Sequence, residues 1–352
     1  MILLNHFITA ILLSLFISDT PYYSVANIEW VDVGGTEGII VHDYADPNQP
    51  IKLLDANLDQ KIGTLRSGRG PGEVSQADDI DNFFYSSFMD SFLVIWDRDR
   101  FRGMIYDENL NYVSDIKGLD EFTLYRFLVI NDNHGIGIRR TAGEAPFILF
   151  DLNKTENGTF IASKVNELQT PESLKPMVEN RLLRQGRTIQ LEEITLTGFL
   201  YSSTLLAINE HGISWKTAQP EDYSLPIYEG VEQPDAYTRI FKAPDVADYP
   251  MGVLDLAGND DYFFILYSGR KGPDPPDGWF RRLFSQITFD PDELLHGKRL
   301  FLYDHEGQFI NEFSIPMEAR TLAVSKDRIW LGSEAGRYPE IQGYRIEEIL
   351  GE

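Results

Sequence analysis

The sequence has 352 residues, of which 43% are hydrophobic and 12% aromatic, and this composition supports a large buried core and excludes a disordered acidic chain. Lys and Arg total 31 against 55 Asp and Glu, giving a formal net charge of -24; we expect no nucleic-acid partner, because such a chain repels phosphate backbones. The absence of cysteine excludes disulfide scaffolds, thiolate metal sites and cysteine nucleophiles.

Residues 1–26 have the layout of a secretory signal peptide. An apolar run from Phe7 to Ile17 is followed by polar and small residues, and Ser24 to Ala26 form a small-x-small cleavage site. An uncleaved membrane anchor is the alternative, although the run is shorter than the roughly 20 residues of a spanning helix. No cysteine is available for lipid attachment. We expect a periplasmic or secreted protein whose folded domain spans 27–352, with membrane attachment only if the segment is not cleaved.

The rest of the chain repeats one pattern, in which a short apolar strand ends on an acidic residue and a polar turn leads into a second apolar strand. Ile51 to Leu65 and Arg299 to Ile315 are examples. Each strand-rich segment has roughly 50 residues, the length of a four-stranded propeller blade. Six such segments are predicted: Ile28 to Leu65, Ile80 to Leu119, Leu124 to Val165, Ile189 to Ala218, Tyr249 to Phe313 and Arg320 to Ile349.

The pattern changes at residues 170–187, for which the sequence predicts a helical insertion. Thr170 is a capping residue, Pro171 suits the first helical position, and Gly186 follows the last turn. We expect this helix to interrupt the strands between the third and fourth segments.

These segments predict an all-β fold, a six-bladed β-propeller of four-stranded antiparallel blades with one short helical insertion. Closing such a ring requires that the first and last blades be joined. Residues Ile28 to Val33 are the expected strand for completing the blade formed by the C-terminal strands.

A glycine-rich stretch, LRSGRGPGE from Leu65 to Glu73, directly follows the first hairpin. The hexapeptide GRGPGE in this position resembles the six-bladed, TolB-like propeller proteins of Bacteroidetes-type bacteria, which are related to the NHL-repeat propellers. The resemblance implies an exported propeller, usually a lipoprotein, with no established catalytic role. This chain departs from that pattern in lacking a lipidation cysteine and in its predicted helical segment from Glu172 to Arg187.

The same stretch is the first candidate ligand site. Its glycines allow positive backbone dihedrals, and a glycine-rich loop that bears arginines is suited to hold a carboxylate or phosphate. In the alternative interpretation the loop only connects two blades tightly, and Arg69 and Glu73 pair with each other or with neighbouring blades. The candidate ligand-binding residues here are Arg66, Arg69 and Glu73.

The second candidate is the segment from Ser268 to Phe284, the longest irregular loop. It concentrates basic and aromatic residues beside a rigid proline-rich stretch, and such side chains dominate binding hot spots. In the alternative interpretation Trp279 packs on the rim of the propeller. The candidate ligand-binding residues are Arg270, Lys271, Trp279, Arg281 and Arg282.

Metal and catalytic motifs are not evident. The segment from Asn131 to Gly135 lacks the spacing of a calcium loop and is predicted to be a hairpin turn. The six histidines show no zinc-binding pattern, and there is no Gly-x-Ser-x-Gly nucleophile elbow. Four aspartates end strands in similar repeat positions: Asp97, Asp151, Asp255 and Asp304. Each is expected to form hydrogen bonds with the turn that follows it. In the alternative interpretation, carboxylates from several blades come together at the central channel and bind a calcium ion.

Two functions therefore follow from the sequence. The first is a non-enzymatic binding module, a monomer without cofactor, that holds a protein or carbohydrate-like ligand. The alternative is a calcium-dependent hydrolase or lactonase, in which carboxylates at the central channel bind an ion that activates water. Arginines or aromatics in the channel favour the first, and three or more converging carboxylates favour the second.

Overall fold

The computed structural model describes residues 22–75, 85–89, 91–139, 145, 147–168, 186–191, 194–199, 205–216, 230–231, 240–241, 252–270, 294–336 and 338–350. Residues 1–21, which contain the apolar run of the predicted signal peptide, lie outside this set. In the described part of the chain the elements are strands and one short helix, α4 (Ile346–Leu350). No helix there is long and apolar enough to cross a membrane.

The first half of the chain forms two sheets. The first is four-stranded, with the order β1-β2-β3-β4: β1 (Asn27–Val33), β2 (Thr36–His42), β3 (Ile51–Asp55) and β4 (Lys61–Leu65). The second is eight-stranded: β5 (Tyr85–Met89), β6 (Phe92–Asp97), β7 (Arg102–Tyr106), β8 (Tyr112–Lys117), β9 (Leu124–Asn131), β10 (His134–Arg139), β11 (Phe147–Lys154) and β12 (Phe160–Leu168).

The second half repeats the antiparallel arrangement. One four-stranded sheet contains β13 (Gly186–Leu191), β14 (Ile194–Phe199), β15 (Leu205–Asn209) and β16 (Gly212–Lys216). Another contains β19 (Val253–Gly258), β20 (Phe263–Tyr267), β21 (Gly297–Tyr303) and β22 (Phe309–Ala319). A two-stranded ribbon of β17 (Gly230–Val231) and β18 (Ile240–Phe241) lies between them in the chain, and the last sheet has β23 (Thr321–Val324), β24 (Arg328–Ser333) and β25 (Glu340–Arg345).

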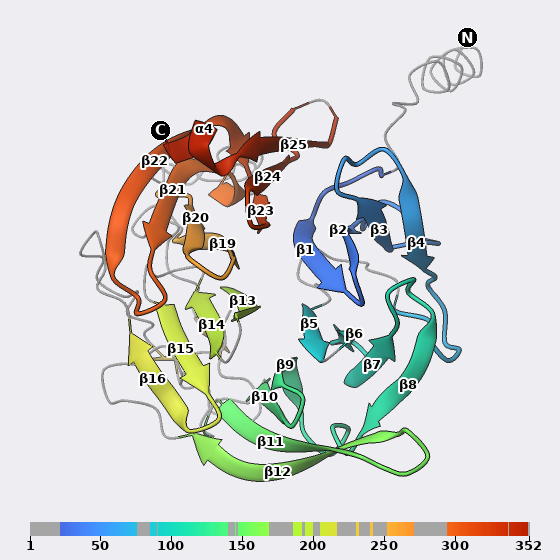
Figure 1. Ribbon diagram of the computed structural model, residues 1–352. Coiled ribbons are helices and arrows are strands. Elements are labelled where there is room, and N and C mark those ends of the chain that lie inside the picture. The colour runs from blue at the N-terminus through green and yellow to red at the C-terminus, as the bar shows by residue number, and fades with distance from the viewer. Residues whose placement is uncertain are drawn as a thin grey trace.

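Successive runs of four antiparallel strands, followed by the three-stranded last sheet, are arranged around a common centre, as in a β-propeller (Figure 1). The first strands β1, β5, β9, β13, β19 and β23 face the centre, and β4, β8, β12, β16 and β22 lie at the periphery. The eight-stranded sheet consists of two antiparallel runs, β5 to β8 and β9 to β12. They join at the periphery, where β8 and β12 pair in parallel at Ile116 with Phe160 and Lys117 with Ile161.

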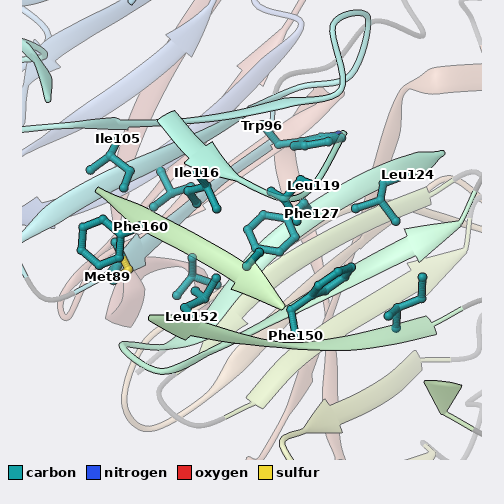
Figure 2. Close-up of a cluster of buried hydrophobic side chains, with 14 residues drawn as sticks. Met89, Trp96, Ile105, Ile116, Leu119, Leu124, Phe127, Phe150, Leu152 and Phe160 are labelled. Atoms are coloured by element: carbon teal, nitrogen blue, oxygen red, sulfur yellow. The ribbon is translucent and has the colours of Figure 1, made fainter. Parts of the chain in front are cut away.

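Buried apolar clusters lie between consecutive runs and explain why the middle strands are continuously apolar. Figure 2 shows one of them, in which Trp96 and Ile105 of the second run meet Phe127 and Phe150 of the third. The rings of Phe127 and Phe150 pack edge to face, with centroids 5.8 Å apart. Strands such as Phe263–Tyr267 are buried along their whole length, because both faces of the sheet contact a neighbouring run.

The predicted way of closing the ring is wrong. β1, which contains Ile28 to Val33, does not complete the last sheet but pairs with β2 over its whole length, from Asn27 opposite His42 to Val33 opposite Thr36. The last sheet, β23-β24-β25, contacts the first through the side of β1, and Trp30 stacks on Trp330 with ring centroids 4.9 Å apart. Side-chain packing and side-chain hydrogen bonds, rather than a shared sheet, join the two ends.

The predicted helix at 170–187 is wrong at its C-terminal end, and residues 169–185 lie outside the described residues. Gly186 and Arg187 begin β13, and Gly186 pairs with Phe199 of β14. A Cβ atom on Gly186 would overlap the carbonyl oxygen of Gly198. The glycine therefore allows two strands to approach closely and does not end a helix.

The predicted acidic turn recurs between the third and fourth strands of the runs. In the turn after β7, the Asp107 carboxylate accepts hydrogen bonds from the backbone N–H groups of Asn109 and Asn111, at 2.9 and 2.8 Å. Asp304 accepts the same kind of bond from Gln308, at 2.7 Å. These aspartates stabilise the turns because their carboxylates accept hydrogen bonds from backbone N–H groups that the bend leaves without a backbone acceptor.

In four of these turns one residue has a positive φ. That residue is a glycine in two turns (Gly158 and Gly307) and a leucine in the other two (Leu58 and Leu110). Leu110 has φ 61 and is only 7% exposed. A Cβ atom on Gly63 would lie 3.3 Å from the Leu110 side chain, so Leu110 packs on β4 of the preceding run. The strained leucine thus links two consecutive runs at the periphery.

Replacing Leu110 by glycine is expected to lower the free energy of unfolding by about 2 kcal/mol. Glycine removes about 1 kcal/mol of backbone strain, but loss of the buried side chain costs about 3 kcal/mol. Urea unfolding measures the difference. As a control, Gly158→Ala should cost only about 1 kcal/mol, since a Cβ atom there meets nothing within 4 Å. A Leu110→Gly variant more stable than the wild type would contradict this account.

Candidate functional site

The connections between strands differ sharply at the two ends of the fold. Because neighbouring strands are antiparallel, the turns that follow the first and third strands of each run lie at one end, and all the other connections lie at the opposite end. The turns at the first end have two to five residues. At the other end, four pairs of strand ends are joined by 17 residues or more, namely 66–84, 169–185, 217–252 and 268–296, much of which lies outside the described residues.

We call these ends the short-turn face and the long-connection face. Long loops on a rigid scaffold are where proteins commonly place binding residues. The first strands all begin at the long-connection face, so their opening residues surround the centre of that face. These residues include several buried polar side chains.

A set that we call the axial polar ring consists of buried polar residues near the starts of the first strands: Asn27, Ser87, Arg126, Arg187, Thr188, Asp255 and Thr321. Thr321 Oγ1 lies 2.9 Å from Asn27 Oδ1 and is also hydrogen-bonded to the Asp255 carboxylate. The backbone N–H of Leu322 donates to Asp255 Oδ2 at 2.9 Å. β1, β23 and β19 are therefore linked directly through side chains.

Arg187 continues this network onto β13. Its Nε donates to the carbonyl oxygen of Leu254 at 3.1 Å and lies 3.5 Å from Asp255 Oδ1. Its Nη2 donates to the carbonyl oxygen of Ala26 at 3.5 Å. Burial raises the pKa of Asp255, and the Arg187 guanidinium opposes this shift. The pair thus places a carboxylate and a cation together in a water-poor environment.

Arg187 also acts on His42, the last residue of β2. Burial first, and then the Arg187 cation, lower the pKa of His42 to about 3. Glu29 Oε1 lies 3.6 Å from His42 Nε2, yet the pKa of His42 is lowered. His42 is therefore neutral at physiological pH.

Arg126 and Ser87 extend the network to β9 and β5. Arg126 is completely buried; its Nη1 donates to Thr188 Oγ1 at 2.6 Å, and its guanidinium also bonds the carbonyl oxygen of Gly186. Ser87 Oγ accepts the backbone N–H of Val129 at 2.9 Å. Side-chain bonds therefore join β5, β9, β13, β19, β23 and β1 in succession. Two arginines and one aspartate are the charged members of the ring.

Metal-ligand groups are not gathered at this centre in the part of the chain that the structure describes. No three His, Cys, Asp or Glu side chains among those residues are close enough to hold one ion. Of the four aspartates considered from sequence, only Asp255 belongs to the axial polar ring. Asp97 is buried and bonds Ser75, Asp151 lies 3.4 Å from the ring of His134, and Asp304 bonds its own turn.

The predicted hairpin at Asn131 to Gly135 is confirmed. β9 ends at Asn131 and β10 begins at His134, and Asn131 Oδ1 accepts the backbone N–H of Asn133 at 3.0 Å. This bond is the usual way in which an asparagine stabilises a tight turn.

The glycine-rich loop lies on the long-connection face, and its own glutamate fills its interior. Glu73 Oε2 accepts the backbone N–H of Gly70 at 2.6 Å, and a Cβ atom on Gly68 would overlap the Glu73 carboxylate. Arg66 and Arg69 are exposed, and in the described part of the chain their side chains make no ion pair or hydrogen bond. The glycines serve close approach to Glu73, and the two arginines face solvent.

The second predicted segment leaves the same face, between β20 and β21. Arg270 is described there, and its Nη2 lies 2.7 Å from Glu318 Oε1 of β22. The other four candidates, Lys271, Trp279, Arg281 and Arg282, lie outside the described residues. The described candidates on the long-connection face are therefore Arg66, Arg69, Glu73 and Arg270, and they belong to connections of different runs.

No family model matches this chain, and no curated protein matches it significantly. Solved structures that match it include a putative exported protein from Bacteroides fragilis, with a TM-score of 0.51 and 12% identity over 90% of this chain and 81% of that one. A DUF4221 family member from Bacteroides vulgatus matches with a TM-score of 0.49 and 9% identity, covering 93% and 94%. Virginiamycin B lyase from Staphylococcus aureus matches with a TM-score of 0.43 and 12% identity, covering 94% and 86%. The structural neighbours are β-propeller-like, and the likeness concerns the fold alone.

Proposed function

We propose that this protein is an exported, monomeric binding module without catalytic activity, and that it holds a protein or carbohydrate-like ligand on its long-connection face. The observation that carries the proposal is the contrast between the two ends of the fold. Turns of two to five residues close one end, and connections of up to 36 residues, 217–252, leave the other. A scaffold of this kind positions variable loops around one surface for recognition.

We further propose that the ring has six blades, as in the TolB-like propellers that the sequence resembles. Support comes from the buried clusters, which lie between each pair of consecutive antiparallel runs and again between the last run and the first. On this proposal β23, β24 and β25 form the sixth blade, and the eight-stranded sheet is two blades joined at the periphery.

The composition of the axial polar ring supports binding over metal-dependent hydrolysis. Arg126 and Arg187 lie where a calcium-dependent enzyme would require several carboxylates. Export is supported by the signal-peptide layout of residues 1–26 and by the similarity in fold to the putative exported protein of Bacteroides fragilis.

The test compares two double variants that remove the same charge from opposite faces. Arg66→Ala/Arg69→Ala alters the long-connection face, and Lys326→Ala/Arg345→Ala alters exposed residues at the short-turn face. The probes are an array of neutral and acidic oligosaccharides and a library of displayed peptides. The same arrays applied to Trp279→Ala/Arg281→Ala test the second predicted segment.

Ligands that bind the wild type are expected to bind at least one long-connection variant about tenfold more weakly, a loss of about 1.4 kcal/mol. The short-turn variant should bind them as the wild type does. Binding that is lost only in the short-turn variant, or that is absent for every probe while esters or lactones are hydrolysed, would contradict the proposal.

A further inference from the structure

Residues 22–26, which directly precede β1, pack into the folded core, except for the exposed side chain of Tyr23. Val25 is completely buried, and Tyr22, Ser24 and Ala26 are each less than 5% exposed. Tyr22 and Val25 belong to the apolar cluster that lies between the first and last sheets, together with Trp330 and Ile341. We call residues 22–26 the clasp.

The clasp is bonded to the first sheet through Asp43, which follows β2 and is completely buried. Asp43 Oδ2 accepts the backbone N–H of Tyr23 at 2.7 Å, and Asp43 Oδ1 accepts the backbone N–H and the hydroxyl of Ser24 at 2.9 and 3.0 Å. Lys52, itself buried, forms an ion pair with Asp43. The backbone N–H of Ala26 donates to the carbonyl oxygen of His42 at 3.1 Å.

The clasp is also bonded to the last sheet. The backbone N–H of Val25 donates to Glu334 Oε1 at 2.7 Å, and Glu334 Oε2 accepts Arg320 Nη1 at 2.9 Å. The Tyr22 hydroxyl accepts the backbone N–H of Ile341, the second residue of β25, at 3.1 Å. A Cβ atom on Gly332 would lie only 2.6 Å from the Val25 side chain, so the two sheets and the clasp are packed without a gap.

These contacts conflict with the cleavage site that the sequence suggests after Ala26. Cleavage there would remove the donors that Asp43 and Glu334 bind through Tyr23, Ser24 and Val25. A buried carboxylate that loses its hydrogen-bond donors strongly destabilises the folded state. The loss would fall at the junction of the first and last sheets, the point where the ring closes.

We propose that residues 22–26 belong to the mature protein and close the ring, so that any processing of the predicted leader takes place before Tyr22 and not after Ala26. The proposal rests on the predicted signal peptide and is independent of the proposed binding function. In other closed rings, a strand shared between the two termini joins the first and last parts of the ring. The proposal gives this role to the clasp.

Two measurements test it. In the first, the full-length chain is expressed with export and the intact mass of the purified protein is determined. An N-terminus at Tyr22 or upstream of it is expected, including the uncleaved chain, whereas an N-terminus at Asn27 would overturn the proposal. This readout is independent of whether any ligand is found.

In the second, chains that begin at Tyr22 and at Asn27 are produced without a leader and unfolded thermally. The shorter chain is expected to unfold at least about 10 °C lower or to fail to fold. Because failure to fold gives no midpoint, the Tyr22 chain is also tested with Glu334→Gln and with the exposed control Glu347→Gln. The first should lower the midpoint and the second should not; equal midpoints for the Tyr22 and Asn27 chains would overturn the proposal.

Discussion

Replacing Arg187 by methionine is expected to lower the free energy of unfolding by about 3 kcal/mol at pH 7. Methionine fills similar space but leaves the Asp255 carboxylate, 3.5 Å from Arg187 Nε, buried without this cation. The carbonyl oxygens of Leu254 and Ala26 lose the same donor. Chemical denaturation followed by tryptophan fluorescence measures the change.

The loss should depend on pH in a defined direction. Without Arg187 the pKa of Asp255 rises further, so the folded variant takes up a proton as the pH falls and the cost of the buried charge disappears. The difference between wild type and variant is therefore larger at pH 8 than at pH 5. A difference that is constant across this range would show that Arg187 acts only through packing.

Two further variants separate the charge from the side-chain volume. Arg187→Met/Asp255→Asn should recover part of the lost stability, because position 255 then no longer carries a buried carboxylate that has lost its cation. Arg66→Met removes an exposed arginine and is expected to change the stability by less than about 0.5 kcal/mol. A loss for Arg66→Met as large as that for Arg187→Met would contradict the role given to the axial polar ring.

The stability of the wild type is expected to fall between pH 6.5 and pH 3 because of His42. Its pKa is about 3 in the folded chain, well below the usual value of 6.5. Between these values the unfolded chain binds a proton that the folded chain does not, so acid favours unfolding. The contribution between pH 7 and pH 5 is about 2 kcal/mol.

His42→Gln removes this titration while retaining a polar side chain of similar size. Urea unfolding at pH 7 and pH 5 should show that the wild type loses about 2 kcal/mol more than the variant does. Asp255 and the other carboxylates titrate in both proteins and therefore cancel in the comparison. Equal losses for the two proteins would mean that His42 is not buried beside Arg187.

The sequence predicted the repeated part of the fold because the repeat is local. The acidic turn is recognisable at Asp107 and Asp304 from a few consecutive residues, and the hairpin at Asn131 likewise needs no distant contact. Fully buried strands such as Phe263–Tyr267 also carry their own signal, a short apolar run bounded by turn residues. These features required only periodicity and turn chemistry.

Features that depend on distant contacts were missed. The burial of Ser24, Val25 and Ala26 was missed, because small residues such as Ser24 and Ala26 suit both a cleavage site and close packing. Gly186 looked like the end of a helix, since glycine permits close strand approach as readily as a helix terminus. Local sequence does not distinguish these alternatives.

The axial polar ring was missed for a related reason, although a signal was present. Arg126 interrupts the apolar run of β9, and Asp255 interrupts that of β19. A charged residue inside an otherwise buried strand requires a partner, and here the partner comes from a different strand near the centre. Only the arrangement of the first strands around that centre brings Arg187 to Asp255.

The most direct test of the proposed function is a calorimetric titration of calcium chloride into the chelator-treated protein beginning at Tyr22, with thermal unfolding followed in parallel. A binding module whose axial polar ring contains Arg126 and Arg187 is expected to show no one-site calcium binding and no change in the midpoint of unfolding. Tight binding at one site that raises the midpoint would contradict this account. It would favour the calcium-dependent hydrolase and call for assays with lactones and esters.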